Sequence, residues 1–163
     1  MPRKSADISP ALRNKLIAAA KRVRFNAFAP YSRYYVGSAV LGGSGRIHAG
    51  VNVESPSLIS HVCAERNAIF SAITQGEREI LAVATVCTSS VSCGSCRQMI
   101  REFARGDIPI FAVYHDVERG TERMVRTTIG RLLPESHTGD KFDWKKRTQQ
   151  DAADPKPPRR RAK

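Results

Sequence analysis

Apolar residues near the start of the chain recur every three or four positions, a spacing typical of an amphipathic helix. The repeat predicts a helix over residues 10–27, with Ser9 as its N-terminal cap and Pro10 in its first turn. Its apolar positions are Leu12, Leu16, Ile17, Ala20 and Val23. The segment Ala29-Pro30-Tyr31-Ser32 interrupts the repeat, so we expect the chain to leave the helix before this point.

The following segments alternate between apolar runs and helix-forming stretches. Residues 35–41 and 47–53 are predicted as two strands, joined by a hairpin turn at Gly42-Gly43-Ser44-Gly45. Further along we expect a helix over 63–75, a strand over 80–88, a helix over 94–104, a strand over 108–115 and a short helix over 128–133. Strands that alternate with helices predict an α/β fold, in which helices layer against a mixed sheet.

The composition indicates one folded domain followed by a basic tail. A chain of 163 residues with 41% hydrophobic content can bury one core and has little room for a second. No run approaches the ~18 apolar residues that span a bilayer, and residues 1–5 lack the apolar stretch of a signal peptide. We therefore expect a cytoplasmic protein with no membrane partner.

The charge of the chain is unevenly distributed. The formal net charge is +12, and residues 141–163 contribute half of it through nine Lys/Arg and three Asp. We divide the chain into a catalytic domain at 1–140 and a tail at 141–163. The tail has no periodicity and is predicted to be disordered. The alternative is that it binds a polyanion such as nucleic acid.

Three of the four cysteines have the spacing of a metal site, and four are too few for a disulfide scaffold in a chain of this size. Cys63 lies thirty residues before the pair Cys93 and Cys96. Three thiolates leave one position open on a tetrahedral zinc ion, which is typical of a catalytic zinc site. The sequence therefore predicts Zn²⁺ as the cofactor, held by these three cysteines. Cys87 is expected to be a buried core thiol.

The chemistry that this set favours is hydrolytic deamination. Both motifs stand where a loop enters a predicted helix, and the positive end of a helix favours thiolate over thiol. Glu65 follows Cys63 by two residues and is left free of the metal, so it can move protons to and from a water. Arg66 or Arg97 can offset the negative charge of three thiolates. A glutamate beside three such ligands is typical of zinc deaminases that act on nucleobases.

Other interpretations of the same residues are open at this point. The pair Cys93 and Cys96 alone resembles a thioredoxin-type redox motif, although that leaves Cys63 and Glu65 unexplained. His61 is a candidate fourth ligand, which would make the zinc site a closed, structural one. The other histidines are expected at the surface or at strand ends: His48, His115 and His137.

In their order along the chain, the motifs resemble those of the small zinc-dependent cytidine deaminases, the short-chain class that assembles as homotetramers. The likeness extends from about Ala11 to Pro134. It is carried by Ala29-Pro30-Tyr31-Ser32-Arg33-Tyr34-Tyr35-Val36-Gly37, Gly50-Val51-Asn52-Val53-Glu54, Cys63-Ala64-Glu65-Arg66, Cys93-Gly94-Ser95-Cys96-Arg97-Gln98 and Leu132-Leu133-Pro134.

The resemblance implies a three-layer α/β/α fold with a mixed five-stranded sheet, and conversion of cytidine or 2′-deoxycytidine to the uridine product with release of ammonia in pyrimidine salvage. On the metal side it implies zinc on the three cysteines, Glu65 as the proton shuttle, and Arg66 as the residue that offsets the thiolate charge. The expected partners are a small nucleoside substrate and three further copies of the chain.

On the substrate side the resemblance implies that Asn52 and Glu54 hold the sugar hydroxyls. It places Tyr34 against the pyrimidine ring, with Ala64 also in contact with the substrate. The alternative for Asn52 is a structural role in a turn, and the alternative for Tyr34 is simple packing in the core.

Three positions depart from the family pattern. Ser92 stands where a proline usually precedes the second cysteine pair, Leu58 where a tyrosine is usual, and His137 where an aromatic residue follows Leu-Leu-Pro. Deamination is thus a firmer expectation than cytidine itself. The alternatives are an aminohydrolase of another aminopyrimidine nucleoside such as blasticidin S, against which Glu54 argues, and a nucleic-acid base deaminase that uses the basic tail.

Overall fold

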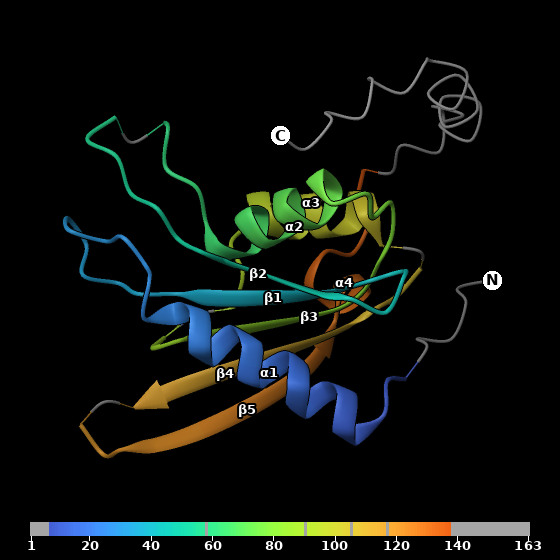
Figure 1. Cartoon of the computed structure of the whole chain (residues 1–163), viewed down its shortest axis with the longest axis horizontal. Helices are drawn as coiled ribbons and strands as arrows, with labels where there is room; N and C mark the ends of the chain where they lie inside the picture. Colours follow the sequence, from blue (N-terminus) through green and yellow to red (C-terminus); the bar gives the residue numbers. More distant parts are fainter. Residues whose placement is uncertain (1–6, 58, 90, 105, 117, 138–163) are drawn as a thin grey trace, which may run out of the picture.

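Four helices and five strands follow one another in the described part of the chain (Figure 1). The structure is a computed structural model and describes residues 7–57, 59–89, 91–104, 106–116 and 118–137. Within them, no helix is both long and apolar enough to cross a membrane. Leu58 and the predicted tail at 141–163 lie outside the described residues. The elements are α1 (Pro10–Arg24), β1 (Gly37–Gly42), β2 (Ile47–Val51), α2 (Ala64–Thr74), β3 (Ile80–Cys87), α3 (Gly94–Phe103), β4 (Pro109–Asp116), β5 (Thr121–Thr128) and α4 (Ile129–Leu132).

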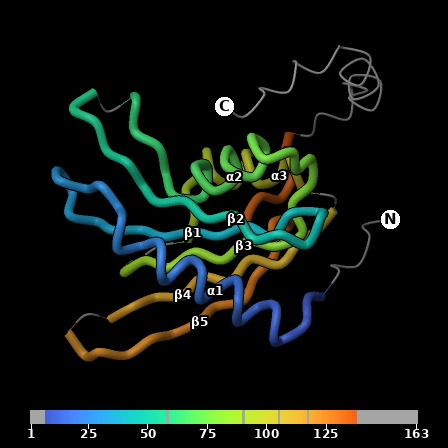
Figure 2. The backbone as a smooth tube through the Cα atoms, viewed as in Figure 1, coloured from blue at the N-terminus to red at the C-terminus, as the bar shows by residue number. Residues whose placement is uncertain are grey.

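One mixed sheet contains all five strands in the order β2-β1-β3-β4-β5. The β3–β4 pair is parallel, and the other three pairs are antiparallel. A parallel pair needs a crossover connection, which α3 supplies between these two strands. Figure 2 shows this path, from the hairpin of β1 and β2 across the sheet to β5. The predicted mixed five-stranded sheet is confirmed.

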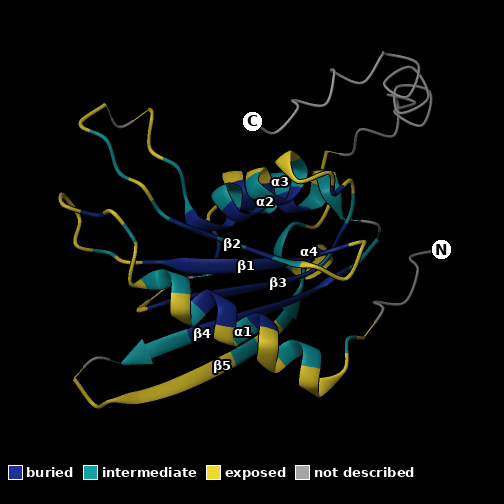
Figure 3. Cartoon of the chain, in the orientation of Figure 1, coloured by how far each residue is buried: buried dark blue, intermediate teal, exposed yellow. Residues whose placement is uncertain are grey.

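Helices cover both faces of the sheet, so the fold has the three layers that the resemblance implies (Figure 1). On one face α1 buries Leu16 and Ala20 completely, in a cluster with residues of β1, β3 and β4. On the other face α2 and α3 bury Ile69 and Ile100 completely. The central strands β1 and β3 are almost entirely buried (Figure 3). Burial on both faces explains why their sequences are nearly continuous apolar runs.

Two glycines allow the helices to approach the sheet closely. A Cβ atom at Gly37 in β1 would stand 2.2 Å from the carbonyl oxygen of Ala20 in α1. A Cβ atom at Gly50 in β2 would stand 2.3 Å from the backbone nitrogen of Ala68 in α2. Both neighbours are helix backbone atoms, which cannot yield unless the helix moves. Glycine at these two positions therefore sets the distance between the layers.

The start of α1 agrees with the prediction, whereas its end does not. The Ser9 hydroxyl accepts a hydrogen bond from the Leu12 backbone N–H at 3.2 Å, and Pro10 is the first helical residue. The predicted helix extended to residue 27, but α1 ends at Arg24. Phe28 pairs with Val53 as an isolated β-bridge, and this extended contact requires the chain to leave the helix earlier.

The apolar pattern does not reveal β5, which pairs with β4 along its whole length. This strand forms an edge of the sheet, and five of its eight residues are exposed. Its larger apolar residues, Met124 and Val125, are neighbours in sequence, so the strand lacks the alternation that marks a half-buried strand. Only the short helix that follows it was predicted at this end of the domain.

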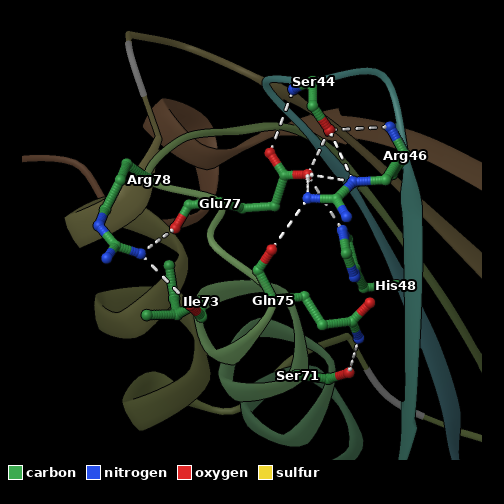
Figure 4. Close-up of polar contacts among 8 residues, drawn as sticks. All are labelled: Ser44, Arg46, His48, Ser71, Ile73, Gln75, Glu77 and Arg78. Carbon is green, nitrogen blue, oxygen red and sulfur yellow. Dashed lines mark hydrogen bonds and ion pairs between the residues drawn. The ribbon is translucent and has the colours of Figure 1, made fainter. Parts of the chain in front are cut away.

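A buried carboxylate ties the β1–β2 hairpin to the segment between α2 and β3 (Figure 4). Glu77 is 4% exposed and accepts hydrogen bonds from the Ser44 backbone N–H at 3.1 Å, from the Ser44 hydroxyl, and from Arg46 Nε at 3.2 Å. His48 Nε2 lies 3.2 Å from the same carboxylate. We call these four residues the Glu77 cluster. His48 was predicted at the surface or a strand end, but it is buried in β2 because it belongs to this cluster.

Candidate active site

The helices α2 and α3 begin next to each other, and each begins at a cysteine. Cys63 is the N-cap residue of α2, Cys93 is the N-cap residue of α3, and Cys96 lies in the first turn of α3. Neither N-cap side chain forms a hydrogen bond to its own helix. Their sulfurs therefore remain available to a shared ligand, at the ends of two helix dipoles that favour thiolates.

The three sulfurs have the separations that a tetrahedral metal ion requires. Cys63 Sγ lies 3.9 Å from Cys93 Sγ, which lies 3.5 Å from Cys96 Sγ, and all three are within 4.8 Å of one another. Sulfurs bound at ~2.3 Å to a tetrahedral zinc ion stand about 3.8 Å apart. Among the described residues His61 is not part of this group, so the closed four-ligand alternative is not supported. The cysteine cluster fits zinc with one position left open.

Protons are shared unequally among the sulfurs when no cation is bound. The pKa of Cys63 is lowered to about 5, chiefly because the Cys96 thiol donates a hydrogen bond to its sulfur, with Cys93 and Arg66 adding to the effect. The pKa of Cys96 is raised by the same bond and by burial. The cluster thus retains protons in the absence of metal. A divalent cation replaces these protons, so metal binding and thiol ionisation are coupled.

Arg66 is placed to offset the charge of the Cys63 thiolate. Its Nη2 donates a hydrogen bond to the carbonyl oxygen of His61 at 3.0 Å, and its charge helps to lower the Cys63 pKa. Its buried Nε has no hydrogen-bond partner among the described residues, and such a donor beside a sulfur suits a negatively charged, metal-bound thiolate. Arg97, the other residue considered for this role, donates Nε to the carbonyl oxygen of Ser92 at 2.7 Å and so supports the start of α3.

Glu65 lies in the first turn of α2, directly beside the sulfurs. Its side chain is buried, with the residue 4% exposed, and its Oε2 lies 3.7 Å from Cys96 Sγ. Burial is the main reason that the pKa of Glu65 is raised, and the charge of Cys63 adds to it. A raised pKa brings this acid closer to the pH at which general acid–base catalysis is most efficient.

A cavity of about 540 Å³ opens in front of Glu65 and the cysteine cluster. This volume is typical of sites that enclose a small organic molecule. The residues predicted on the substrate side all line it: Tyr34, Asn52, Glu54 and Ala64. The structure thus brings Cys63, Cys93, the acid and the predicted substrate-side residues together around one cavity, although they come from four separate segments of the chain.

Asn52 connects the cavity wall to the segment that leads into β1. Its Oδ1 accepts a hydrogen bond from the Val36 backbone N–H at 2.8 Å, and its Nδ2 donates to the Tyr34 carbonyl oxygen at 2.7 Å. Tyr34 is partly buried and packs against the cluster of Val36, Ala64 and Cys87, whereas the bonds of Asn52 join two segments and do not form a turn. One N–H and one acceptor lone pair of the amide are not used by these two bonds.

Glu54 holds the loop that follows α1. Its carboxylate accepts hydrogen bonds from the backbone N–H of Tyr31 at 2.9 Å, from the backbone N–H of Ser32 at 3.1 Å, and from the Ser32 hydroxyl. The hydroxyl bond is the main reason that the pKa of Glu54 is lowered. Glu54 is therefore an anion at neutral pH, fixed in position by its own chain.

Three further residues of the cavity wall were not assigned to it from the sequence. Thr85 is 3% exposed on β3, and its Oγ1 lies 3.3 Å from the Ser38 hydroxyl. The sequence feature that could have indicated it is a polar residue within an apolar run. His61 lines the wall near Glu54, whose pKa its charge helps to lower. Ser92 is 4% exposed beside Glu65, and its only signal was the departure from proline.

Comparisons with known proteins agree with this geometry. Residues 11–112 match the family model described as the cytidine and deoxycytidylate deaminase zinc-binding region. A cytidine deaminase of Sporosarcina psychrophila is 40% identical over 125 residues, which are 74% of this chain and 87% of that protein. A second, of Halalkalibacterium halodurans, is 33% identical over 78% of this chain and 96% of that protein.

A solved structure shares the fold as well as the sequence. The crystal structure of cytidine deaminase from Burkholderia pseudomallei is 35% identical, superposes with a TM-score of 0.66, and covers 76% of this chain and 98% of its own. The family match covers more than half of the chain, and it includes all three cysteines and Glu65. This chain belongs to the cytidine and deoxycytidylate deaminase zinc-binding family.

Proposed function

We propose that this chain is a zinc-dependent hydrolase that converts cytidine and 2′-deoxycytidine to uridine and 2′-deoxyuridine, with release of ammonia. The observation that carries the proposal is the buried Glu65 carboxylate, 3.7 Å from the sulfur of Cys96, in the wall of a cavity of about 540 Å³. The relatives at 40% and 33% identity are cytidine deaminases, which supports cytosine as the base.

The metal side of the site supplies the nucleophile. We assign Cys63, Cys93 and Cys96 as the zinc ligands and Arg66 as the group that offsets their charge. A zinc ion held by these residues would act as a Lewis acid and would make water nucleophilic near neutral pH. Glu65 then performs the proton transfers from the adjacent turn of α2.

Glu65 acts first as a base and then as an acid. It accepts a proton from the attacking water as the water oxygen bonds to C4 of the ring, and it delivers that proton to N3. It next takes the proton that remains on the new hydroxyl and passes it to the amino group. The C4–N bond breaks, ammonia leaves, and C4 keeps a carbonyl oxygen. Burial of Glu65, which raises its pKa, suits an acid that alternates between these states.

The substrate side orients the nucleoside. We assign Glu54 and Asn52 to the sugar hydroxyls. These hydroxyls can bond to the carboxylate and amide lone pairs, and to the amide N–H, that the hydrogen bonds within the protein do not use. Tyr34 is assigned to the face of the pyrimidine ring. Ala64 lines the cavity at the start of α2, and we assign it a contact with the base.

The charge of the cavity favours a nucleoside over a nucleotide. Glu54 and Glu65 line it, and no lysine or arginine is found among the described residues of its wall. A 5′-phosphate would therefore meet carboxylates without a cation to pair with it. We propose that cytidine is turned over and that its monophosphate is a poor substrate.

The assembly and setting of the enzyme are part of the proposal. Several large apolar side chains are exposed around the loops that border the cavity, a feature typical of interaction surfaces. They include Phe25, Phe28, Tyr31 and Ile59, and we propose that they are covered in a homotetramer, which light scattering would test.

The four free cysteines are consistent with a reducing cytoplasm, where the product would enter pyrimidine salvage. We assign residues 1–140 as the catalytic domain and 141–163 as a tail without a catalytic role.

The test is an ultraviolet deamination assay on zinc-loaded protein. Cytidine and 2′-deoxycytidine should be turned over, whereas cytosine, cytidine monophosphate, blasticidin S and single-stranded DNA should not. Glu65→Gln should keep its zinc and lose turnover, while Glu102→Gln, which changes an exposed glutamate of α3, should keep both. Faster turnover of blasticidin S or DNA than of cytidine would refute the proposal, as would an active Glu65→Gln.

A further inference from the structure

The Ser92 hydroxyl is a buried polar group for which the mechanism above has no use. Ser92 is 4% exposed and lines the cavity. Its Oγ is inaccessible to solvent and makes no well-formed hydrogen bond to any described residue. Burial of a hydroxyl without a partner costs free energy, so such a group in an active-site wall calls for an explanation.

The backbone of Ser92 holds this hydroxyl in one place. Its carbonyl oxygen accepts the hydrogen bond from Arg97 Nε at 2.7 Å, and Arg97 in turn donates Nη1 to the Leu132 carbonyl oxygen at 3.0 Å. Ser92 also directly precedes Cys93, the N-cap residue of α3. The Ser92 side chain can rotate about its Cα–Cβ bond, but the position of its backbone is fixed by contacts to α3 and α4.

A buried acceptor in the same cavity wall, and one that interacts with the Ser92 side chain, is the Glu65 carboxylate. Glu65 and Ser92 are both buried in the wall of the same cavity, and Ser92 directly precedes Cys93, whose sulfur lies 3.5 Å from Cys96 Sγ. The other side-chain donor beside the carboxylate is the Cys96 thiol, whose sulfur lies 3.7 Å from Oε2. Because a cysteine that binds a metal gives up its proton, Cys96 cannot donate in the loaded enzyme. Within the part of the chain that the structure describes, Ser92 then remains as a side-chain donor to Glu65.

We propose that Ser92 is a positioning residue for the Glu65 carboxylate: its hydroxyl donates a hydrogen bond that keeps the acid turned toward the cavity. This inference rests on the proposed role of Glu65 in proton transfer. A carboxylate held at one rotamer transfers protons over a fixed distance, and displacement by about 1 Å can cost on the order of 100-fold in rate.

The test compares Ser92→Ala with Ser92→Thr, which restores a hydroxyl. Ser92→Ala should lower kcat for cytidine by about 10- to 100-fold with KM changed less than threefold, and Ser92→Thr should recover most of the loss. Zinc content should stay at one ion per chain. Ser38→Ala, which removes an equally buried hydroxyl that bonds to Ala84 and Thr85, should leave kcat within about twofold.

A second readout needs no turnover. The effect of Ser92→Ala on the Tm of zinc-loaded protein should be about 2–4 °C larger in the wild type than in a Glu65→Ala background. Additive effects would overturn the proposal, and so would a Ser92→Ala enzyme with an unchanged kcat or with no recovery by Ser92→Thr. Because this cycle measures the contact itself, its result is independent of whether cytidine is the substrate.

Discussion

Replacement of Glu77 by glutamine should weaken the fold without touching the cavity. Glutamine keeps the size of the side chain but loses its charge, and its NH₂ group would face donors in place of one carboxylate oxygen. Oε1 accepts from the Ser44 hydroxyl and Arg46 and contacts His48, whereas Oε2 accepts from the Ser44 backbone N–H, so an amide cannot serve all of these groups (Figure 4). Each of them lies on the β1–β2 hairpin, so the change uncouples this hairpin from the end of α2.

The size of the effect follows from the burial of the partners. A buried donor left without its acceptor costs about 1–3 kcal/mol, and more where the lost acceptor was charged. The side chains of Glu77 and His48 are 3% and 2% exposed, but that of Arg46 is 55% exposed and can turn to water. We therefore expect Glu77→Gln to lower the free energy of unfolding by about 2–3 kcal/mol. In a chain of this length the Tm should fall by roughly 4–12 °C.

The loss should depend on pH in a defined direction. The pKa of Glu77 is lowered from its ordinary value of 4.5 to about 2, mainly by the Ser44 hydroxyl. A carboxylate with a depressed pKa contributes stability that is present above its unfolded pKa and is lost as pH falls toward its folded pKa. The difference between wild type and Glu77→Gln should thus be full at pH 7 and shrink between about pH 4.5 and pH 2. Zinc loss in acid affects both proteins and leaves this difference intact.

Urea unfolding followed by circular dichroism measures the effect at pH 7 and near pH 3. Glu102→Gln is the matched control, because it removes the same charge from an exposed position on α3, and it should change the free energy of unfolding by less than about 0.5 kcal/mol. If Glu77→Gln unfolds like this control at pH 7, or if its deficit is the same at both pH values, the assigned role of the carboxylate is wrong.

Three further predictions concern the metal and its supporting helix. Cys63→Ser should lose zinc in metal analysis of the purified protein, whereas Cys87→Ala should retain it. Arg66→Gln should raise the pKa of the Cys63 thiol, so zinc should be released at a higher pH than in wild type or in the control Arg78→Gln; identical release curves would contradict this. Gly50→Ala should lower both Tm and kcat, because its methyl group would meet α2 backbone at 2.3 Å, and an unchanged kcat would argue against this close contact.

The metal site was predictable because its determinants are local. Each motif spans four residues, and each requires only that a helix start at its first cysteine. The two motifs could be linked by their shared chemistry, because three thiolates and a free acid match few sites other than a catalytic zinc site. The resemblance to the family predicted the fold that brings Cys63 Sγ to 3.9 Å from Cys93 Sγ.

Features that depend on distant pairing were not predictable from the pattern. Glu77 and Ser44 are 33 residues apart, and a single glutamate after a helix looks like any solvated charge. In the same way β5 has no alternation of its own, because an exposed edge strand is specified by its partner β4 and not by a core. Ser92 could be recognised as a departure but not as a donor, since only the packing of α2 beside α3 places it near Glu65.

The two ends of α2 have different consequences for the enzyme. The helix has eleven residues, so Glu77, just beyond its C-terminal end, acts about 17 Å from the turn that holds Glu65. Loosening that end leaves the first turn anchored by the sulfurs and by the close contact at Gly50. Stability should therefore fall in Glu77→Gln while kcat per folded molecule is preserved. A methyl group at Gly50 instead presses on the backbone of Ala68, three residues after the acid, and displaces the acid from the cavity. The separation of these two outcomes follows from a helix that is fixed independently at each end.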